Sequence, residues 1–146
     1  MLDHKLLEQF SKVVDQAAYS SSLLKGKNDK IAADQAAVDS MRNYLNKIDM
    51  NGKIVIGEGE MDEAPMLFIG EKLGTGNGEP LDIAVDPLDG TTLTAKNLPD
   101  AISVIAVAEK GNLLQAPDTY MEKIAIGPYY PENIIDLDNS LETNLN

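Results

Sequence analysis

The segment VDPLDGTT, residues 85–92, directly follows an apolar run and carries two carboxylates. Asp86 and Asp89 flank a proline that removes a backbone donor, and Gly90 lets another group approach the backbone closely. Two carboxylates that a rigid turn holds together repel each other, and a divalent cation relieves that repulsion. A plain Asp-Pro turn explains the proline and the glycine, but not a second aspartate followed by two hydroxyls, the first on Thr91. The pattern favours a metal clamp with a threonine that positions a nucleophile.

Asp34 is a further carboxylate in an apolar context. It precedes Val38, Met41 and Leu45 at helical spacing, which places it on the apolar face of a helix, near the N-terminal end. One interpretation is an aspartate that caps the helix and favours its dipole, which is common. The other is a metal ligand, because a buried charge must be paired or must coordinate an ion. Both interpretations stay open at this point.

Glu58 and Glu60 lie in the motif GEGE, directly after the strand-like segment KIVIG. The glycines on either side of Glu58 allow the backbone to turn sharply and to approach another group. An ordinary acidic loop at the end of a strand would have the same sequence. The motif alone is therefore weak evidence for a site.

Composition leaves oxygen atoms as the means of doing chemistry. The 146 residues include no cysteine and a single histidine, His4, which excludes disulfides, thiolate chemistry and a Ser-His triad. The net charge of -12 argues against nucleic acid and anionic membranes as partners. Carboxylate, carbonyl and water oxygens are the ligands that Mg²⁺ and Mn²⁺ prefer.

The sequence is typical of a globular cytoplasmic protein. Its start lacks the basic and apolar regions of a signal peptide, and no apolar run approaches the roughly 20 residues of a membrane span. The length is that of one domain. We therefore predict a single metal-binding domain over residues 1–146.

Apolar periodicity predicts an α+β fold, with helices packed on a mixed β-sheet. The expected helices cover residues 3–24, 32–47 and 62–73, the last with Pro65 in its first turn. The expected strands cover residues 53–57, 81–86, 101–110, 112–117 and 122–128, with a hairpin at 110–112. No helix follows the last strand, so one face of the sheet is expected to need a partner or a second half.

The chain resembles the class II (GlpX-type) fructose-1,6-bisphosphatases, within the lithium-sensitive, metal-dependent sugar phosphatase superfamily. The similarity lies in KIVIGEGEMDEAPMLFIGEKLGTG, LDIAVDPLDGTT and LQAPDTYMEKIAIGP, and NDKIAADQAAVDSMRNYLNKIDMNG fits the same family. It extends over about residues 8–138. The resemblance implies the N-terminal half of a layered α/β/α fold.

The resemblance also implies roles for individual residues. The implied metal ligands are Asp34, Glu58, Asp86 and Asp89. The implied catalytic residues are Asp62, Lys30 and Thr91, and the substrate contacts are Asp89, Gly90, Thr91 and Tyr120. By residue type alone, Lys30 would be a solvated lysine, Asp62 a helix cap and Tyr120 a packing residue.

The implied reaction is hydrolysis of the 1-phosphate of fructose 1,6-bisphosphate to fructose 6-phosphate and phosphate, a step of gluconeogenesis that needs Mg²⁺ or Mn²⁺. Two metal ions about 3.5–4 Å apart would clamp the phosphate and acidify a water. The family usually has glutamate where this chain has Asp89, the residue found in inositol monophosphatases. Members of the family also continue into a second domain with basic groups, whereas Arg42 is the only arginine here.

The main hypothesis is therefore the metal-binding half of a fructose-1,6-bisphosphatase that acts on a small sugar phosphate. We expect it to form a homo-oligomer or to need a missing second half. One alternative is an inactive metal-binding remnant that assembles with a partner. The other is a related inositol or sugar monophosphatase.

Overall fold

The computed structural model describes residues 4–59, 66–114 and 122–145. The chain falls into two compact units, residues 1–115 and 116–146, which we describe separately. The first unit contains α1 (His4–Ser22), α2 (Lys30–Leu45), β1 (Met50–Ile56), β2 (Lys72–Leu73), β3 (Glu79–Asp89), α3 (Thr91–Ala95) and β4 (Ile102–Glu109). The second contains α4 (Leu141–Leu145). The single domain over residues 1–146 stays a prediction.

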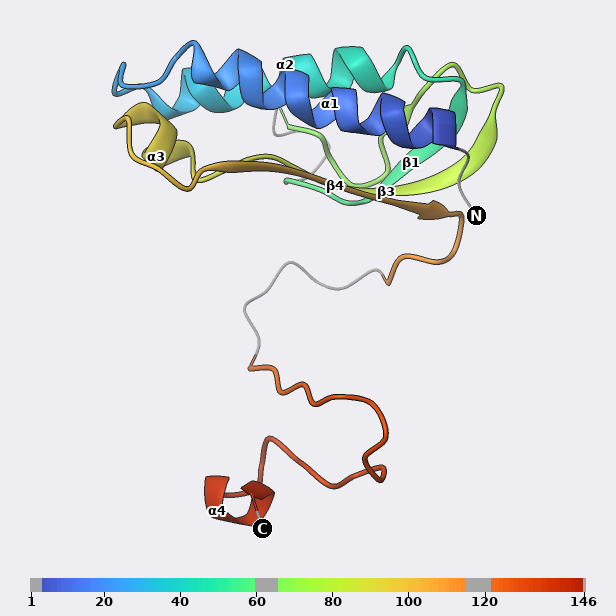
Figure 1. Ribbon diagram of the computed structural model, residues 1–146. Coiled ribbons are helices and arrows are strands. Elements are labelled where there is room, and N and C mark those ends of the chain that lie inside the picture. The colour runs from blue at the N-terminus through green and yellow to red at the C-terminus, as the bar shows by residue number, and fades with distance from the viewer. Residues whose placement is uncertain (1–3, 60–65, 115–121, 146) are drawn as a thin grey trace. The chain divides into compact units, whose positions relative to one another are not determined.

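The first unit is a layer of helices on a mixed sheet. The strand order is β2-β1-β3-β4, in which β1 and β3 are parallel while the two outer pairs are antiparallel. Figure 1 shows α1 and α2 side by side over the same face of this sheet. The predicted α+β class and the mixed sheet are confirmed.

The core forms where the apolar stripes of the helices meet the alternate residues of the strands. Burial alternates along the first five residues of β1: Met50 and Ile54 are buried, whereas Asn51 and Lys53 are exposed, as strand geometry requires. The largest fully buried side chains include Val13, Val38, Met41, Leu45, Met50, Ile54, Leu67, Leu81 and Ile83. Burial of each such side chain contributes about 1.5–3 kcal/mol, which holds the helices on the sheet.

The helix predicted over residues 62–73 is wrong for the part that the structure describes. Residues 66–71 form neither helix nor strand, and β2 occupies the last two positions. The segment instead bonds to β1: the Gly70 N–H donates to the Ile54 carbonyl, and the Ile54 N–H donates to the Glu71 carbonyl. Pairing with a strand edge and burial of Leu67 outweigh the local helical pattern here.

Two of the predicted strands are not found among the described residues. Residues 112–114 and 122–128 contain no strand, and residues 115–117 lie outside the described ranges. The alternation of Ile124 and Ile126 is typical of a strand, but a strand forms only where its N–H and C=O groups find a partner. Sequence periodicity cannot supply that partner.

The segment Asp86–Asp89 is extended rather than tightly bent. β3 continues through Pro87, which is fully buried, and ends at Asp89. The register between β3 and β4 is irregular between Asp86 and Asp89, which accommodates a proline that cannot donate a ladder hydrogen bond. The chain turns one residue later, at Gly90, whose φ is 92°.

Among the described residues, no helix is long and apolar enough to cross a membrane. The second unit is largely turns and bends, as its polar sequence predicts. Asn144, within its short helix α4, donates a hydrogen bond from its side-chain amide to the Asp136 carbonyl.

The central strand should carry much of the stability. Replacing Ile83, which is fully buried between β1 and β4, by alanine should lower the free energy of unfolding by about 2–5 kcal/mol, because it leaves a cavity. The matched control Ile102→Ala, on the half-exposed end of β4, should cost no more than about 1 kcal/mol. Urea denaturation of the two variants measures both values, and equal losses would contradict this placement of the core.

Candidate metal centre

Three elements end at the same edge of the first unit. Because β1 and β3 are parallel, their carboxyl ends meet, and these ends carry Glu58, two residues after β1, and Asp86 near the end of β3. α2 runs into β1 through the short turn at residues 46–49, so its N-terminal half lies over that same end. This half carries Asp34. The sheet topology therefore gathers three carboxylates that are far apart in the sequence.

The loop between α1 and α2 holds the start of α2 against α3. The Gly26 N–H donates to the Thr94 carbonyl at 3.0 Å, and the Asn28 N–H donates to the Ala95 carbonyl at 2.8 Å. These carbonyls lie in the last turn of α3, where a short helix leaves acceptors without an internal donor. Thr91, the first residue of α3, is thereby placed beside the element that carries Asp34.

Three buried carboxylate oxygens have no hydrogen-bond partner among the described residues: Asp34 Oδ1, Glu58 Oε2 and Asp86 Oδ1. A buried polar atom without a partner costs roughly 1–3 kcal/mol, and more when it is charged, so folded proteins rarely leave one without a reason. All three belong to residues that the sequence analysis named as metal ligands. The donor set is entirely carboxylate, which suits a hard divalent cation.

Burial raises the pKa of all three carboxylates, and neighbouring negative charges raise the pKa of Glu58 and Asp86 further. Burial, then the charges of Asp34 and Asp86, raise the pKa of Glu58 to about 7. Burial raises the pKa of Asp34. The pKa of Asp86 is raised by burial and then by the charge of Asp89, although a hydrogen bond from the Leu88 N–H opposes the shift. Glu58 and Asp86 therefore share one electrostatic cluster with Asp34, and no positive charge among the described residues is a cause of these shifts.

The carboxylates are near one another without converging on a point. Within the described residues, no three His, Cys, Asp or Glu side chains are arranged to hold one ion as they stand. Charges influence a pKa over several ångströms, whereas ligand oxygens must lie about 2.0–2.6 Å from a common ion. Rotation of a side chain can bring an unpaired oxygen inward, so these carboxylates can converge on an ion without movement of the backbone.

The alternative interpretation of Asp34 as a helix cap is wrong. The cap is Asp29, whose carboxylate accepts the Ala32 N–H at 2.9 Å. Asp34 lies in the second turn of α2, with one oxygen fully buried. The sequence pattern of an Asn-Asp pair before the helix could have identified the true cap.

The structure describes some of the remaining predicted site residues and not others. Asp89 is exposed but close enough for its charge to act on Asp86; Gly90 is left-handed, and Thr91 is half-buried. Lys30 is exposed at the first position of α2. Asp62, Tyr120 and Glu60 lie outside the described residues.

Gly57 allows a close contact between two backbone segments beside Glu58. A Cβ atom at this position would lie 2.3 Å from the Leu67 carbonyl oxygen, so only glycine allows the two backbones to come this close. The same carbonyl accepts the Glu58 N–H at 3.0 Å. The backbone that carries Glu58 is therefore fixed by the segment that follows it.

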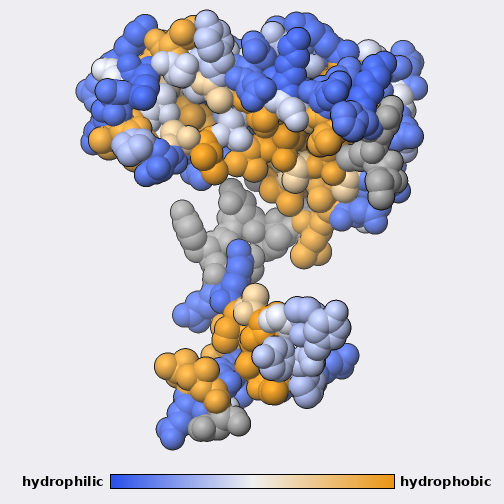
Figure 2. Space-filling view, viewed as in Figure 1, coloured by the Kyte–Doolittle hydropathy of each residue, from blue (hydrophilic) through white to orange (hydrophobic). Residues whose placement is uncertain are grey.

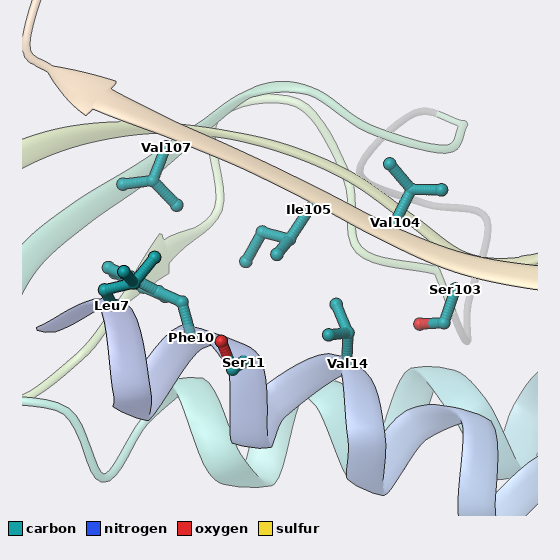
Figure 3. A pocket seen from close by; sticks show the side chains of 8 residues that line it. All are labelled: Leu7, Phe10, Ser11, Val14, Ser103, Val104, Ile105 and Val107. Carbon is teal, nitrogen blue, oxygen red and sulfur yellow. The ribbon is translucent and has the colours of Figure 1, made fainter.

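An apolar cavity lies elsewhere in the first unit. A cavity of about 530 Å³ is formed between α1 and β4, where Phe10 and Val14 face Ile105 and Val107 (Figure 3). Figure 2 shows hydrophobic side chains gathered along this part of the unit, and Ile102 and Val104 of β4 are about half exposed. The cavity contains none of the carboxylates. The candidate centre is thus marked by charge and unpaired oxygens rather than by concavity.

Residues 4–146 match the family described as bacterial fructose-1,6-bisphosphatase, glpX-encoded. The chain belongs to this family. The resemblance stated from the motifs is thereby confirmed, and it covers both units of the structure.

Named relatives agree with this assignment. The chain is 51% identical to fructose-1,6-bisphosphatase 1 class 2 of Escherichia coli (strain K12), over 97% of this chain and 42% of the relative. It is 51% identical to the class 2 enzyme of Haemophilus influenzae, over 99% and 43%. It is 47% identical to a class 2 fructose-1,6-bisphosphatase/sedoheptulose 1,7-bisphosphatase of Synechococcus sp. (strain CC9902), also over 99% and 43%. The chain spans about two fifths of the length of these relatives.

The raised pKa of Glu58 predicts how stability depends on pH in the metal-free chain. Glu58 holds its proton to about pH 7 when folded, against an ordinary value of 4.5. The folded state therefore binds more protons within this window, and the free energy of unfolding falls as the pH rises. Glu58→Gln should remove this contribution, so that the variant loses less stability than the wild type between about pH 5 and about pH 8.

Urea denaturation in EDTA at several pH values measures the effect. The matched control is Glu79→Gln, an exposed glutamate at the start of β3, which should keep the slope of the wild type. A Glu58→Gln variant with an unchanged slope would show that this carboxylate is not in the buried, repulsive setting described above.

Proposed function

We propose that this chain is the metal-binding part of a phosphatase that hydrolyses the 1-phosphate of fructose 1,6-bisphosphate. The observation that carries the proposal is the set of three unpaired, buried carboxylate oxygens on Asp34, Glu58 and Asp86. Membership of the glpX-encoded family and the names of the relatives support the reaction and the substrate. The product would be fructose 6-phosphate, and the released group would be inorganic phosphate.

Asp34, Glu58 and Asp86 would hold Mn²⁺ or Mg²⁺, with Asp89 as a further ligand. A bound divalent ion would neutralise charge on the scissile phosphate and acidify the attacking water. Each carboxylate must be deprotonated to bind it, so the raised pKa of Glu58 should make binding weaken as the pH falls below about 7.

The other proposed residues act on the water and the substrate. Thr91 would accept or donate a hydrogen bond that orients the attacking water, because its hydroxyl follows the carboxylates at the start of α3. Gly90 would contact the phosphate through its backbone, which its left-handed conformation turns at the end of β3. Lys30 would contribute positive charge, and Asp62 and Tyr120 keep the catalytic and substrate roles implied by the family motifs. We propose direct attack by water, without a covalent intermediate.

Replacing Asp86 tests the metal site. Asp86→Asn should weaken Mn²⁺ binding by at least about tenfold, because an amide oxygen carries no charge. Isothermal titration calorimetry of the purified chain measures the affinity. The matched control is Asp82→Asn on the same strand, since the Asp82 carboxylate is buried but accepts the Gly111 N–H at 2.6 Å. Equal affinities of wild type and Asp86→Asn would contradict the site.

The activity itself is tested by phosphate release from fructose 1,6-bisphosphate with Mn²⁺, with Mg²⁺ and with EDTA. We expect weak release at most from the 146-residue chain, because a bisphosphate carries close to four negative charges and Arg42, the only arginine, is bound to Glu71. Release that EDTA abolishes would support the reaction. Activity that persists in EDTA would contradict a metal-dependent mechanism.

A substrate panel separates the alternatives. Asp89, in place of the usual glutamate, favours an inositol or sugar monophosphatase, and the name of the Synechococcus relative adds sedoheptulose 1,7-bisphosphate as a candidate substrate. Preference for an inositol monophosphate would overturn the main proposal. Metal binding without hydrolysis of any sugar phosphate would favour the non-catalytic remnant.

We also propose that the active unit is larger than this chain, either as a homo-oligomer or with a second half, and that it works in the cytoplasm as part of gluconeogenesis. Support for the larger unit comes from β4, which pairs only with β3 among the described strands and leaves Ile102 and Val104 about half exposed. Sedimentation velocity measures whether the purified chain associates.

A further inference from the structure

Arg42 lies on α2, the helix that carries Asp34, and its guanidinium is engaged with one segment of the chain. Its Nε donates to Glu71 Oε1 at 2.7 Å, and its Nη2 donates to Glu71 Oε2 at 3.2 Å and to the Met66 carbonyl. The side chains of Arg42 and Glu71 are only 28% and 13% exposed. Two parallel bonds to one carboxylate, with a third to a carbonyl, form a geometry that lysine cannot reproduce.

Residues 66–71, to which Arg42 is hydrogen-bonded, also fix the backbone of Glu58. Between Met66 and Glu71, the chain is neither helix nor strand and depends on its bonds to neighbours for a defined position. The Leu67 carbonyl, one residue after Met66, accepts the Glu58 N–H at 3.0 Å. The side chain of Leu67 is fully buried, and Gly57 packs against its carbonyl with no room for a Cβ.

Arg42 thus connects α2, which carries Asp34, to the segment 66–71, which positions Glu58. Asp34 and Arg42 are eight residues apart on α2, which is about 12 Å along the helix axis. The helix is a rigid spacer over that length, so a segment fixed to Arg42 is also fixed relative to Asp34. Without the guanidinium, residues 66–71 would keep their bonds to β1 and the core packing of Leu67, but they would lose the hydrogen bonds from Arg42 that join them to α2.

We propose that Arg42 is a positioning residue for the metal centre: through Glu71 and Met66, it holds the Glu58 carboxylate within reach of Asp34. The proposal rests on the metal-binding function proposed above. It also assigns the only arginine of the chain to the architecture of the centre rather than to a phosphate.

Arg42→Gln tests the proposal through Mn²⁺ affinity. Loss of a group that orients a ligand commonly weakens metal binding by about 10–100-fold, and we expect a loss in that range by calorimetry. Arg42→Lys should recover part of it, because the charge remains but the two-pronged bond does not. The matched control is Tyr44→Phe, which removes the bond from the Tyr44 hydroxyl on the same helix to Gln16 and should leave the affinity within about twofold of the wild type.

Amide hydrogen exchange of the metal-free chain provides a second readout. Arg42→Gln should accelerate exchange at the Glu58 and Gly70 amides, which bond within this region, and leave the Ile83 amide of β3 unchanged. Equal acceleration at all three amides would mean a general loss of stability and would overturn the proposal. So would an Mn²⁺ affinity of Arg42→Gln equal to that of the wild type.

Failure of this proposal can be told apart from failure of the proposed function. If the wild-type chain binds no Mn²⁺, the metal-binding function fails, and the exchange pattern alone decides whether Arg42 positions Glu58. If Arg42→Gln does not fold, as judged by circular dichroism, Glu71→Gln replaces it, because it keeps an acceptor oxygen and removes only the charge. That variant should show the same pattern of local exchange and a smaller loss of affinity.

Discussion

The parallel pairing of β1 with β3 is the constraint on which the rest of the structure depends. Its register runs from Met50 opposite Glu79 to Ile56 opposite Ala84. Two parallel strands cannot be joined by a tight turn, so the chain must cross over between them through residues 57–78. That crossover folds back along β1 as residues 66–71 and β2, and it brings the carboxyl ends of both strands to one edge. Glu58 and Asp86 come together because of this pairing, and α2 brings Asp34 to the same edge.

Without a cation, the ionised carboxylates of the centre destabilise the folded state. Half-burial of Glu58 and the neighbouring charges of Asp34 and Asp86 disfavour the ionised state, as the raised pKa values express. A chain selected only for stability would place apolar or hydrogen-bonded groups here. Strongly shifted pKa values are concentrated at functional sites. Here the raised carboxylate pKa values mark the acidic edge, whereas the apolar cavity lies elsewhere. The apolar cavity between α1 and β4 contains none of these carboxylates.

The segments around the centre are held by hydrogen bonds and close backbone contacts rather than by regular secondary structure. The loop before α2 bonds to the last carbonyls of α3, and Arg42 bonds to both ends of the segment 66–71. Gly57 permits the close approach of backbones that places Glu58. Each tie links elements that are distant in sequence, so the positions of the carboxylates are set by several independent attachments. A loop held in this way can present charged groups without a helix or strand of its own.

The sequence by itself determined the α+β class, the two helices, the strands that carry the core and the family, because these depend on local periodicity and on contiguous motifs. It also identified Asp34, Glu58 and Asp86 as carboxylates in unusual contexts. Only the tertiary structure decided that residues 66–71 are not helical and that Arg42 is bound to Glu71. The physical reason is the same in each case: the deciding hydrogen bonds join residues far apart in the chain, and their energies outweigh local propensities of a few tenths of a kcal/mol, up to about 1 kcal/mol, per residue.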